Sequence, residues 1–177
     1  MKKPRGRHKA LQLDANRCIG CYACEVAYKL EHDFPAEPHP IHAIQVGPLE
    51  GDDELLLTFQ PTTCYHCDRP ACVEACPTGA MQKREDGVVF SDLEICIGCQ
   101  TCAIACPFGV PQLNPAIGKI AKCDACKDRI DQGLWPACAL CCPTGALQFA
   151  PPERLVQDIR QKEALRVARC LEEKEEE

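Results

Sequence analysis

The sequence predicts an α+β protein made of two tandem repeats, in which short hairpins, short helices and long loops surround bound metal. Three observations lead to this prediction. Cysteine accounts for 17 of the 177 residues, a density typical of disulfide scaffolds or of metal-binding chains. Aromatic residues are few, with one Trp, three Tyr and five Phe, so a core of ordinary side chains would be thin. The cysteines also fall into groups whose pattern occurs twice in the same order.

Four groups hold most of the cysteines. They are Cys18-x2-Cys21-x2-Cys24, Cys64-x2-Cys67-x4-Cys72-x3-Cys76, Cys96-x2-Cys99-x2-Cys102-x3-Cys106 and Cys123-x2-Cys126-x11-Cys138-x3-Cys142. A proline follows the last cysteine of the second, third and fourth groups. The third group is the complete run C-x2-C-x2-C-x3-C-P of bacterial ferredoxins, in which three thiolates hold one iron–sulfur cluster and the fourth holds its neighbour. The spacing therefore predicts [4Fe-4S] clusters in a ferredoxin-like fold.

Zinc and disulfides are the competing interpretations. Two C-x2-C pairs make a tetrahedral zinc site, but zinc needs neither a third cysteine at this spacing nor the trailing cysteine–proline pair. An odd number of cysteines and the C-x2-C spacing disfavour a disulfide framework. Iron–sulfur clusters are therefore the favoured prediction.

The N-terminus and the hydropathy bear on location. The basic segment 1–9 is followed by no apolar stretch and contains no Arg-Arg pair, which predicts a cytoplasmic protein without an export signal. No stretch approaches the roughly 18 uncharged apolar residues of a membrane span. A reducing cytoplasm also favours metal binding over disulfides.

An internal repeat predicts the domain organisation. Segment 14–21 is echoed by 92–99, and segment 70–80 by 136–146. The predicted parts are a basic arm (1–13), a first ferredoxin-like half with inserted strands at 31–60 (14–82), a second half (83–150), and a C-terminal helix with an acidic tail (151–177). Strands are expected at 41–46 and 55–59, a hairpin over 81–90 with Asp86-Gly87 as its turn, and a helix over 153–170.

In their order, these motifs resemble the four-cluster, ferredoxin-like electron-transfer subunits of molybdenum and tungsten bis-pterin oxidoreductases, such as dimethyl-sulfoxide reductase and formate dehydrogenase. The match covers Cys18 to Cys142, about 70% of the chain. Within that family, the small subunit of bacterial tungsten aldehyde oxidoreductases is the most similar type. The resemblance implies that the first cysteine group pairs with the fourth, and the second with the third.

The implied ligand sets are named here as four sites. They are site 1 (Cys18, Cys21, Cys24, Cys142), site 2 (Cys123, Cys126, Cys138), site 3 (Cys64, Cys67, Cys72, Cys106) and site 4 (Cys96, Cys99, Cys102, Cys76). Four clusters are expected, with the cluster of site 2 in question.

Site 2 departs from the family pattern at its fourth ligand. The resemblance puts that ligand at position 28, where this chain has Tyr28. A phenol with a pKa near 10 and a long ring is a poor replacement for a thiol. A four-iron cluster with a substitute ligand, a three-iron cluster and no cluster all remain open. Cys141 is the candidate substitute, and a small buried hydrophobic residue is its other interpretation.

Two polar residues in the second group have two interpretations each. His66 and Asp68 are interpreted as exposed loop residues, with tuning of a cluster through hydrogen bonds or charge as the alternative.

The sequence predicts an electron carrier without catalytic residues. It contains no Walker A, GxGxxG, HExxH or GxSxG motif. The chain is expected to relay electrons between a tungsten- or molybdenum-pterin subunit that oxidises an aldehyde or formate and an outer acceptor, while the partner's cofactor performs the chemistry. A flavin subunit that handles a nicotinamide is a further expected partner.

Rival functions also follow from the sequence. A free polyferredoxin shuttle and a zinc-organised interaction scaffold are the alternatives, and the repeat leaves end-to-end self-stacking open. A net charge of −6 and the absence of interleaved aromatic residues disfavour nucleic acid as the partner of the basic arm.

Overall fold

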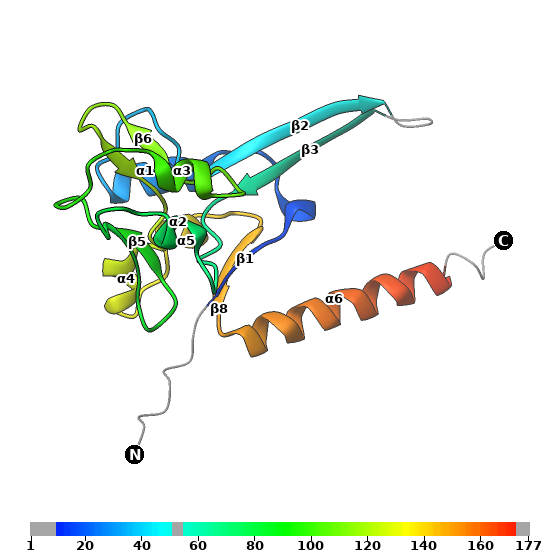
Figure 1. Cartoon of the computed structure of the whole chain (residues 1–177). Helices are drawn as coiled ribbons and strands as arrows, with labels where there is room; N and C mark the ends of the chain where they lie inside the picture. The colour runs from blue at the N-terminus through cyan, green and yellow to red at the C-terminus, as the bar shows by residue number, and fades with distance from the viewer. Residues whose placement is uncertain (1–9, 51–54, 173–177) are drawn as a thin grey trace, which may run out of the picture.

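The two ends of the cysteine-bearing region lie together. The computed structural model describes residues 10–50 and 55–172. Strand β1 (Ala10–Leu13) pairs antiparallel with β8 (Leu147–Ala150), so that Leu11 lies opposite Phe149. This pairing closes the chain into one body, from which a long hairpin and a long helix project (Figure 1).

The long hairpin is formed by β2 (His42–Glu50) and β3 (Leu55–Thr62). It confirms the strands expected at 41–46 and 55–59, and both strands run further than predicted. The register shifts between Val46 and Leu49, where Pro48 cannot donate a ladder hydrogen bond. Ile44, Val46 and Leu57 are exposed on the hairpin, so its far part projects from the body rather than covering the core.

Two short hairpins lie within the body. β4 (Met81–Lys83) pairs with β5 (Val89–Ser91) and confirms the hairpin expected over 81–90. Gly87 in its turn has a φ of +92°, a conformation that favours glycine. β6 (Gln112–Asn114) pairs with β7 (Lys119–Ala121), a hairpin that the sequence did not predict.

Four helices each present one buried cysteine. They are α1 (Ala23–Glu31), α2 (Ala71–Glu74), α3 (Thr101–Ala105) and α5 (Ala137–Leu140). The second residue of each helix is a cysteine, namely Cys24, Cys72, Cys102 and Cys138, and all four are buried. Three of the helices, α2, α3 and α5, end one or two residues before a cysteine that a proline follows. Only α1 continues, because Lys29 follows Tyr28 and the backbone keeps its donor.

The remaining elements are a 3-10 turn, η1 (Ala15–Arg17), a short helix, α4 (Lys127–Asp131), and the long helix α6 (Pro152–Glu172). α6 confirms the helix expected over 153–170 and extends away from the body (Figure 1). Leu155 is buried near the start of α6, and Lys162 forms an ion pair with Asp14. No helix in the described part of the chain is both long and apolar enough to cross a bilayer.

Cysteine takes a large share of the core. One group of buried residues gathers Cys24, Cys123, Cys126 and Cys138 around Tyr28, and a second is built on Cys72 and Cys102. Every cysteine side chain that the structure describes is free of disulfide bonds. The basic segment 1–9 and the acidic residues 173–177 lie outside the described residues, and the predicted domain boundaries stay predictions.

Candidate metal centres

The four cysteines of site 1 come from opposite ends of the chain and line one cavity. Its volume is about 320 Å³, part of it open to solvent. Burial and the charge of Glu25 raise the pKa of Cys24 to about 12. Burial also acts on Cys142, but a hydrogen bond from the Leu147 amide (3.4 Å) and one with the Thr144 hydroxyl (3.8 Å) outweigh it and lower the pKa of that thiol. The thiolate form is therefore favoured at Cys142, whereas burial disfavours it at Cys24.

The four cysteines of site 3 line a second cavity, of about 300 Å³, part of it open to solvent. The rings of Tyr65 and Phe108, whose centroids lie 4.6 Å apart, share its wall with Lys122. Burial raises the pKa of Cys72, and the nearby charge of Lys122 opposes that effect. Site 3 is thus an apolar pocket with one positive charge at its wall.

Site 4 lies against site 3. Cys102 is buried in the same group of residues as Cys72, and Cys76 and Cys96 pack against that group. Cys99 is exposed. Burial, followed by the charge of Cys76, raises the pKa of Cys102 to about 11. The set therefore has one exposed edge, unlike site 2.

The three sulfurs of site 2 are the most deeply buried. Cys123, Cys126 and Cys138 are 3%, 2% and 3% exposed. Burial raises the pKa of all three thiols, that of Cys126 to about 12. A metal centre binds the deprotonated thiolate and so offsets this cost of burial.

Neither of the two residues considered as the fourth ligand of site 2 presents a free ligand atom to its three sulfurs. Tyr28 is 3% exposed, and its hydroxyl donates a hydrogen bond to the carbonyl oxygen of Lys122 at 3.2 Å. Cys141 follows α5 and is exposed at the surface. The ligand atom of Tyr28 is therefore already engaged, and Cys141 faces solvent while its three predicted partners are buried.

Each of the four sites has a backbone amide that donates to one of its sulfurs, at 3.4 to 3.5 Å. These bonds run from Leu147 to Cys142 in site 1, Ala125 to Cys123 in site 2, His66 to Cys64 in site 3 and Met81 to Cys76 in site 4. Hydrogen bonds to cluster sulfurs stabilise negative charge and raise the reduction potential. The recurrence of the same donor type fits thiolate ligands in all four places.

The spacing of the thiols distinguishes a cluster from a single ion. Among the described residues, two groups place three possible ligand atoms within 4.8 Å of one another, Glu25–His39–His42 and His32–Asp124–Cys126. None of the four thiol sets is so tight. Sulfur ligands of one tetrahedral zinc ion lie about 3.8 Å apart, given a Zn–S bond of about 2.3 Å. The wider sets, together with the cavities at sites 1 and 3, fit a multi-iron cluster better than zinc.

Lys122 and His66 lie between sites 2 and 3. The ammonium of Lys122, which is 6% exposed, donates to the carbonyl oxygens of Val89 and Cys123. His66 accepts a hydrogen bond at Nδ1 from the Val89 amide (2.9 Å), and its Nε2 lies 4.0 Å from Cys123 Sγ. The interpretation of His66 as an exposed loop residue is therefore wrong, whereas Asp68 is exposed as expected.

Glu25 connects α1 to the start of β2 and to His39 just before it, close to site 1. The buried carboxylate accepts hydrogen bonds from His39 Nδ1 (3.0 Å), His42 Nδ1 (2.9 Å) and the Ala43 amide (2.7 Å). His39 also bonds Glu37 through Nε2, at 3.0 Å. The network fixes the start of α1, from which Cys24 projects.

Consecutive sites contact one another in a single order. Cys24 of site 1 and Cys138 of site 2 lie in one buried group, and Cys64 of site 3 packs against it. Cys72 of site 3 and Cys102 of site 4 share the second group. The thiol sets therefore follow one another from site 1 to site 4.

Comparison with known proteins agrees with this arrangement. Residues 55–151 match the family of 4Fe-4S dicluster domains. The chain belongs to this family. This chain is 41% identical over 152 residues to the probable anaerobic dimethyl sulfoxide reductase chain YnfG of Escherichia coli K12, covering 82% of this chain and 74% of that one. The [4Fe-4S] cofactor predicted from the cysteine spacing is thereby confirmed.

Two further relatives are similar to this chain over most of its length. It is 45% identical over 139 residues to the thiosulfate reductase electron transfer subunit PhsB of Salmonella typhi, covering 77% of this chain and 72% of that one. It is 34% identical over 164 residues to one of the chains of the polysulfide reductase of Wolinella succinogenes, covering 89% and 86%. The resemblance to iron–sulfur subunits of this enzyme group is confirmed, and the narrower likeness to tungsten aldehyde oxidoreductases stays a prediction.

Proposed function

We propose that this chain is the electron-transfer subunit of a molybdenum- or tungsten-pterin oxidoreductase, with a [4Fe-4S] cluster held at each of sites 1 to 4. Bound clusters supply one-electron redox chemistry. The observation that carries the proposal is the unbroken order of thiol sets through the core, in which Cys24 neighbours Cys138 and Cys72 neighbours Cys102. Such an order suits relay between two ends of the molecule.

The protein contributes ligands, burial and charge. The amide donors stabilise the sulfur atoms, and Lys122 brings a positive charge to the wall between sites 2 and 3. Site 2 is shielded from water, and site 3 is partly buried, while Cys99 of site 4 and Cys21 of site 1 are exposed. The exposed ends are where electrons enter and leave.

Matching contacts support two tandem halves. Cys76 is contacted by the hydroxyl of Thr78 and by the amide five residues on, and Cys142 is contacted in the same way through Thr144. The two cysteines occupy equivalent places in the second and fourth groups. We infer that one ferredoxin-like plan, used twice, generates the two ends of the relay.

A stable partner is favoured over a free shuttle. Val156, Ile159 and Val167 are exposed on one face of α6, and exposed apolar patches mark interaction surfaces. The relatives named above belong to reductases. The partner is therefore expected to be a pterin-containing catalytic subunit, and the narrower expectation of a tungsten aldehyde enzyme with a flavin subunit rests on the sequence resemblance.

The cluster content is tested on anaerobically purified protein. Iron and acid-labile sulfide are measured per chain, with EPR spectra before and after reduction. Four clusters give about sixteen iron atoms and three give about twelve. A colourless protein with stoichiometric zinc would overturn the proposal in favour of the scaffold.

The partner is tested by anaerobic co-purification from the native cells with a tagged chain. A large subunit in fixed ratio, carrying molybdenum or tungsten by metal analysis, is the expected result. A chain that purifies alone and reduces many unrelated proteins at similar rates would be a free polyferredoxin.

A further inference from the structure

His32 lies beside site 2 and has no part in the proposed function so far. It follows the last residue of α1, and its amide is bonded to the Tyr28 carbonyl oxygen at 3.1 Å. Its ring also contacts the Tyr28 ring, with centroids 4.3 Å apart, because residues four apart on a helix share one face. The buried Tyr28 therefore supports the imidazole.

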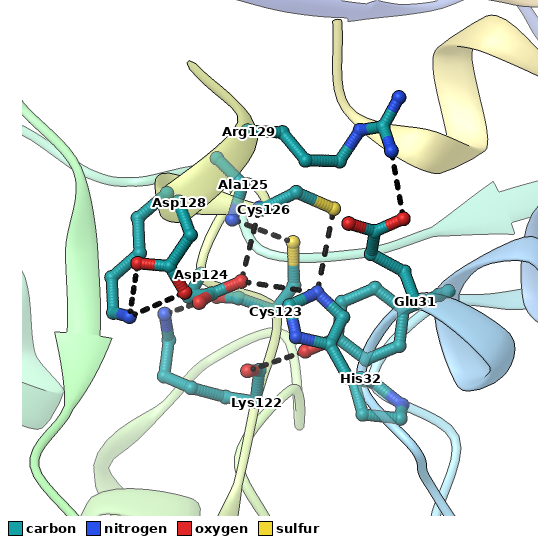
Figure 2. A network of polar contacts seen from close by, with 12 residues as sticks. Glu31, His32, Lys122, Cys123, Asp124, Ala125, Cys126, Asp128 and Arg129 are labelled. Carbon is teal, nitrogen blue, oxygen red and sulfur yellow. Dashed lines mark hydrogen bonds and ion pairs between the residues drawn. The ribbon is translucent and has the colours of Figure 1, made fainter. Parts of the chain in front are cut away.

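An ion pair next to His32 joins this end of α1 to the loop of site 2 (Figure 2). Glu31 Oε2 accepts a hydrogen bond from Arg129 Nη1 at 2.8 Å. Arg129 lies in α4, which begins directly after Cys126. The residue before His32 is thus tied to the helix that follows Cys126, so the imidazole is held in place relative to the Cys126 sulfur.

The position of Nε2 makes His32 a hydrogen-bond donor to Cys126. Nε2 lies 3.4 Å from Cys126 Sγ and 3.6 Å from Asp124 Oδ1. A ligand thiolate and a carboxylate only accept hydrogen bonds, so the nitrogen between them carries the proton. The distance to oxygen is longer than an N–H···O bond, whereas the distance to sulfur equals that from the Ala125 amide to Cys123 in the same site. Ligands of different irons in one cluster lie further apart, so His32 acts on a ligand sulfur and is not itself a ligand.

Imidazole contacts distinguish site 2 from the other three sites. Among the residues that the structure describes, the imidazole–cysteine contacts join His32 to Cys126 and, at the longer distance of 4.0 Å, His66 to Cys123. Both sulfurs belong to site 2, whose thiols are the most deeply buried. Negative charge on a buried group is costly unless donors satisfy it. The side-chain donors therefore lie where water is least able to stabilise a reduced cluster.

We propose that His32 is a positioning residue of site 2, which donates its Nε2 proton to Cys126 Sγ in a hydrogen bond and so raises the reduction potential of the cluster bound there. The inference rests on the proposed function, because it needs a cluster at site 2. Reduction adds negative charge to a cluster, and hydrogen bonds to its sulfurs stabilise that charge. His32 thereby keeps the most buried station of the relay reducible.

The test compares two substitutions in the full chain, purified anaerobically. His32→Leu fills similar space without a donor, whereas His32→Gln carries an amide nitrogen as many bonds from Cβ as Nε2 is. EPR-monitored redox titration gives the midpoint of each cluster, and iron is measured per chain. Both variants are expected to keep the iron content of the wild type, because His32 is not a ligand.

The two variants are expected to differ in one midpoint. In His32→Leu, the ratio of reduced to oxidised cluster at a fixed potential falls about fivefold at that midpoint, which is about 40 mV at about 59 mV per tenfold. His32→Gln stays within about twofold of the wild type, since it keeps a donor. The remaining midpoints stay unchanged in both variants and serve as internal controls.

Lys122 identifies the cluster that responds. Its ammonium lies between sites 2 and 3, so the midpoint that His32→Leu lowers is expected to be one of those that Lys122→Gln also lowers. If His32→Leu fails to fold or loses iron, His32→Asn takes its place. The amide nitrogen of Asn is one bond too short to reach Cys126, so the Asn and Gln variants compare the same donor between two polar side chains.

Three results would overturn the proposal. They are unchanged midpoints in the variants without a donor, equal shifts in the Gln variant, which would show an effect of packing, and a shifted midpoint that does not respond to Lys122→Gln. Wild-type protein with about twelve iron atoms would overturn it too, yet leave the electron-transfer function standing. A chain without iron would instead overturn the proposed function.

Discussion

Lys122 shows how one residue can serve two metal centres. Its ammonium is buried between sites 2 and 3 and is bonded to backbone carbonyls, so its charge acts through protein rather than water. Two unit charges about 8 Å apart interact by about 2 kcal/mol at an effective dielectric of about 20. Because reduction adds negative charge to a cluster, Lys122 favours the reduced state of both neighbours.

Replacement of Lys122 by Gln is expected to lower the reduction potentials of the clusters at sites 2 and 3, by on the order of 0.1 V. Lys122→Arg keeps the charge and is expected to keep most of the potential. EPR-monitored redox titration is the measurement. Lys119→Gln, at the start of the strand that precedes Lys122, removes a half-buried charge bonded to the Leu93 carbonyl and serves as the control, so equal shifts in both Gln variants would contradict the assignment.

Glu25 has a structural role, because its hydrogen bonds hold α1 against β2. Glu25→Ala leaves the buried Ala43 amide and two histidines without their acceptor, and each unsatisfied buried group costs about 1–3 kcal/mol. The free energy of unfolding, measured by chemical denaturation, is expected to fall by about 3 kcal/mol. Glu37→Ala removes only the exposed contact to His39. If it destabilises the protein equally, the network does not hold α1.

For single residues, the sequence identified the cysteines but not the residues that contact them. Spacing assigns the thiols to local groups, and the family resemblance pairs the groups. The Tyr28–Lys122 and His32–Cys126 contacts each join residues 94 positions apart, and no local pattern encodes such a meeting. The departure at Tyr28 was visible as a missing cysteine, but the hydrogen bond of its hydroxyl to the Lys122 carbonyl was not.

Among the elements, turn chemistry decided what was predictable. The β4–β5 hairpin follows from Asp86-Gly87, a strong turn signal. The β6–β7 hairpin has strands of three residues, too short for alternation to be recognised in the sequence. Its turn nevertheless matters, because the carbonyl of Gly118 approaches the loop of site 4 at Gly98.

That approach predicts a specific glycine requirement. A Cβ at Gly98 would lie 2.1 Å from the Gly118 carbonyl oxygen, at a φ of +68°. Gly98→Ala is expected to lower the thermal unfolding midpoint and to release iron from site 4, because overpacking costs about 1–3 kcal/mol beyond backbone strain. Gly118→Ala meets nothing within 4 Å at a similar φ and measures that strain alone, about 1–2 kcal/mol. Equal unfolding midpoints of the Gly98→Ala and Gly118→Ala variants would show that the site 4 loop can move away from the Gly118 carbonyl without cost.

Across the whole molecule, the centres and the partner surface are separable. α6 is joined to the body by few contacts, chiefly the buried Leu155 and the Lys162–Asp14 ion pair. Removal of residues 152–177 is expected to leave iron content and the EPR spectrum unchanged, with a stability loss no larger than the roughly 2–5 kcal/mol of a Leu155→Ala variant. The same truncation is expected to weaken co-purification of the catalytic subunit. Loss of iron on truncation would instead make α6 part of the metal-binding body.

The pairing of β1 with β8 has a consequence for biosynthesis. Site 1 joins Cys18 to Cys142, and the strand that seals it ends at Ala150, so a nascent chain cannot complete this site until the residues up to Ala150 have been synthesised. Sites 3 and 4 draw only on the stretch between Cys64 and Cys106, whose ends need less entropy to bring together. Maturation is therefore expected to begin at sites 3 and 4 and to end at site 1, and a chain that stalls before Cys142 keeps site 1 incomplete.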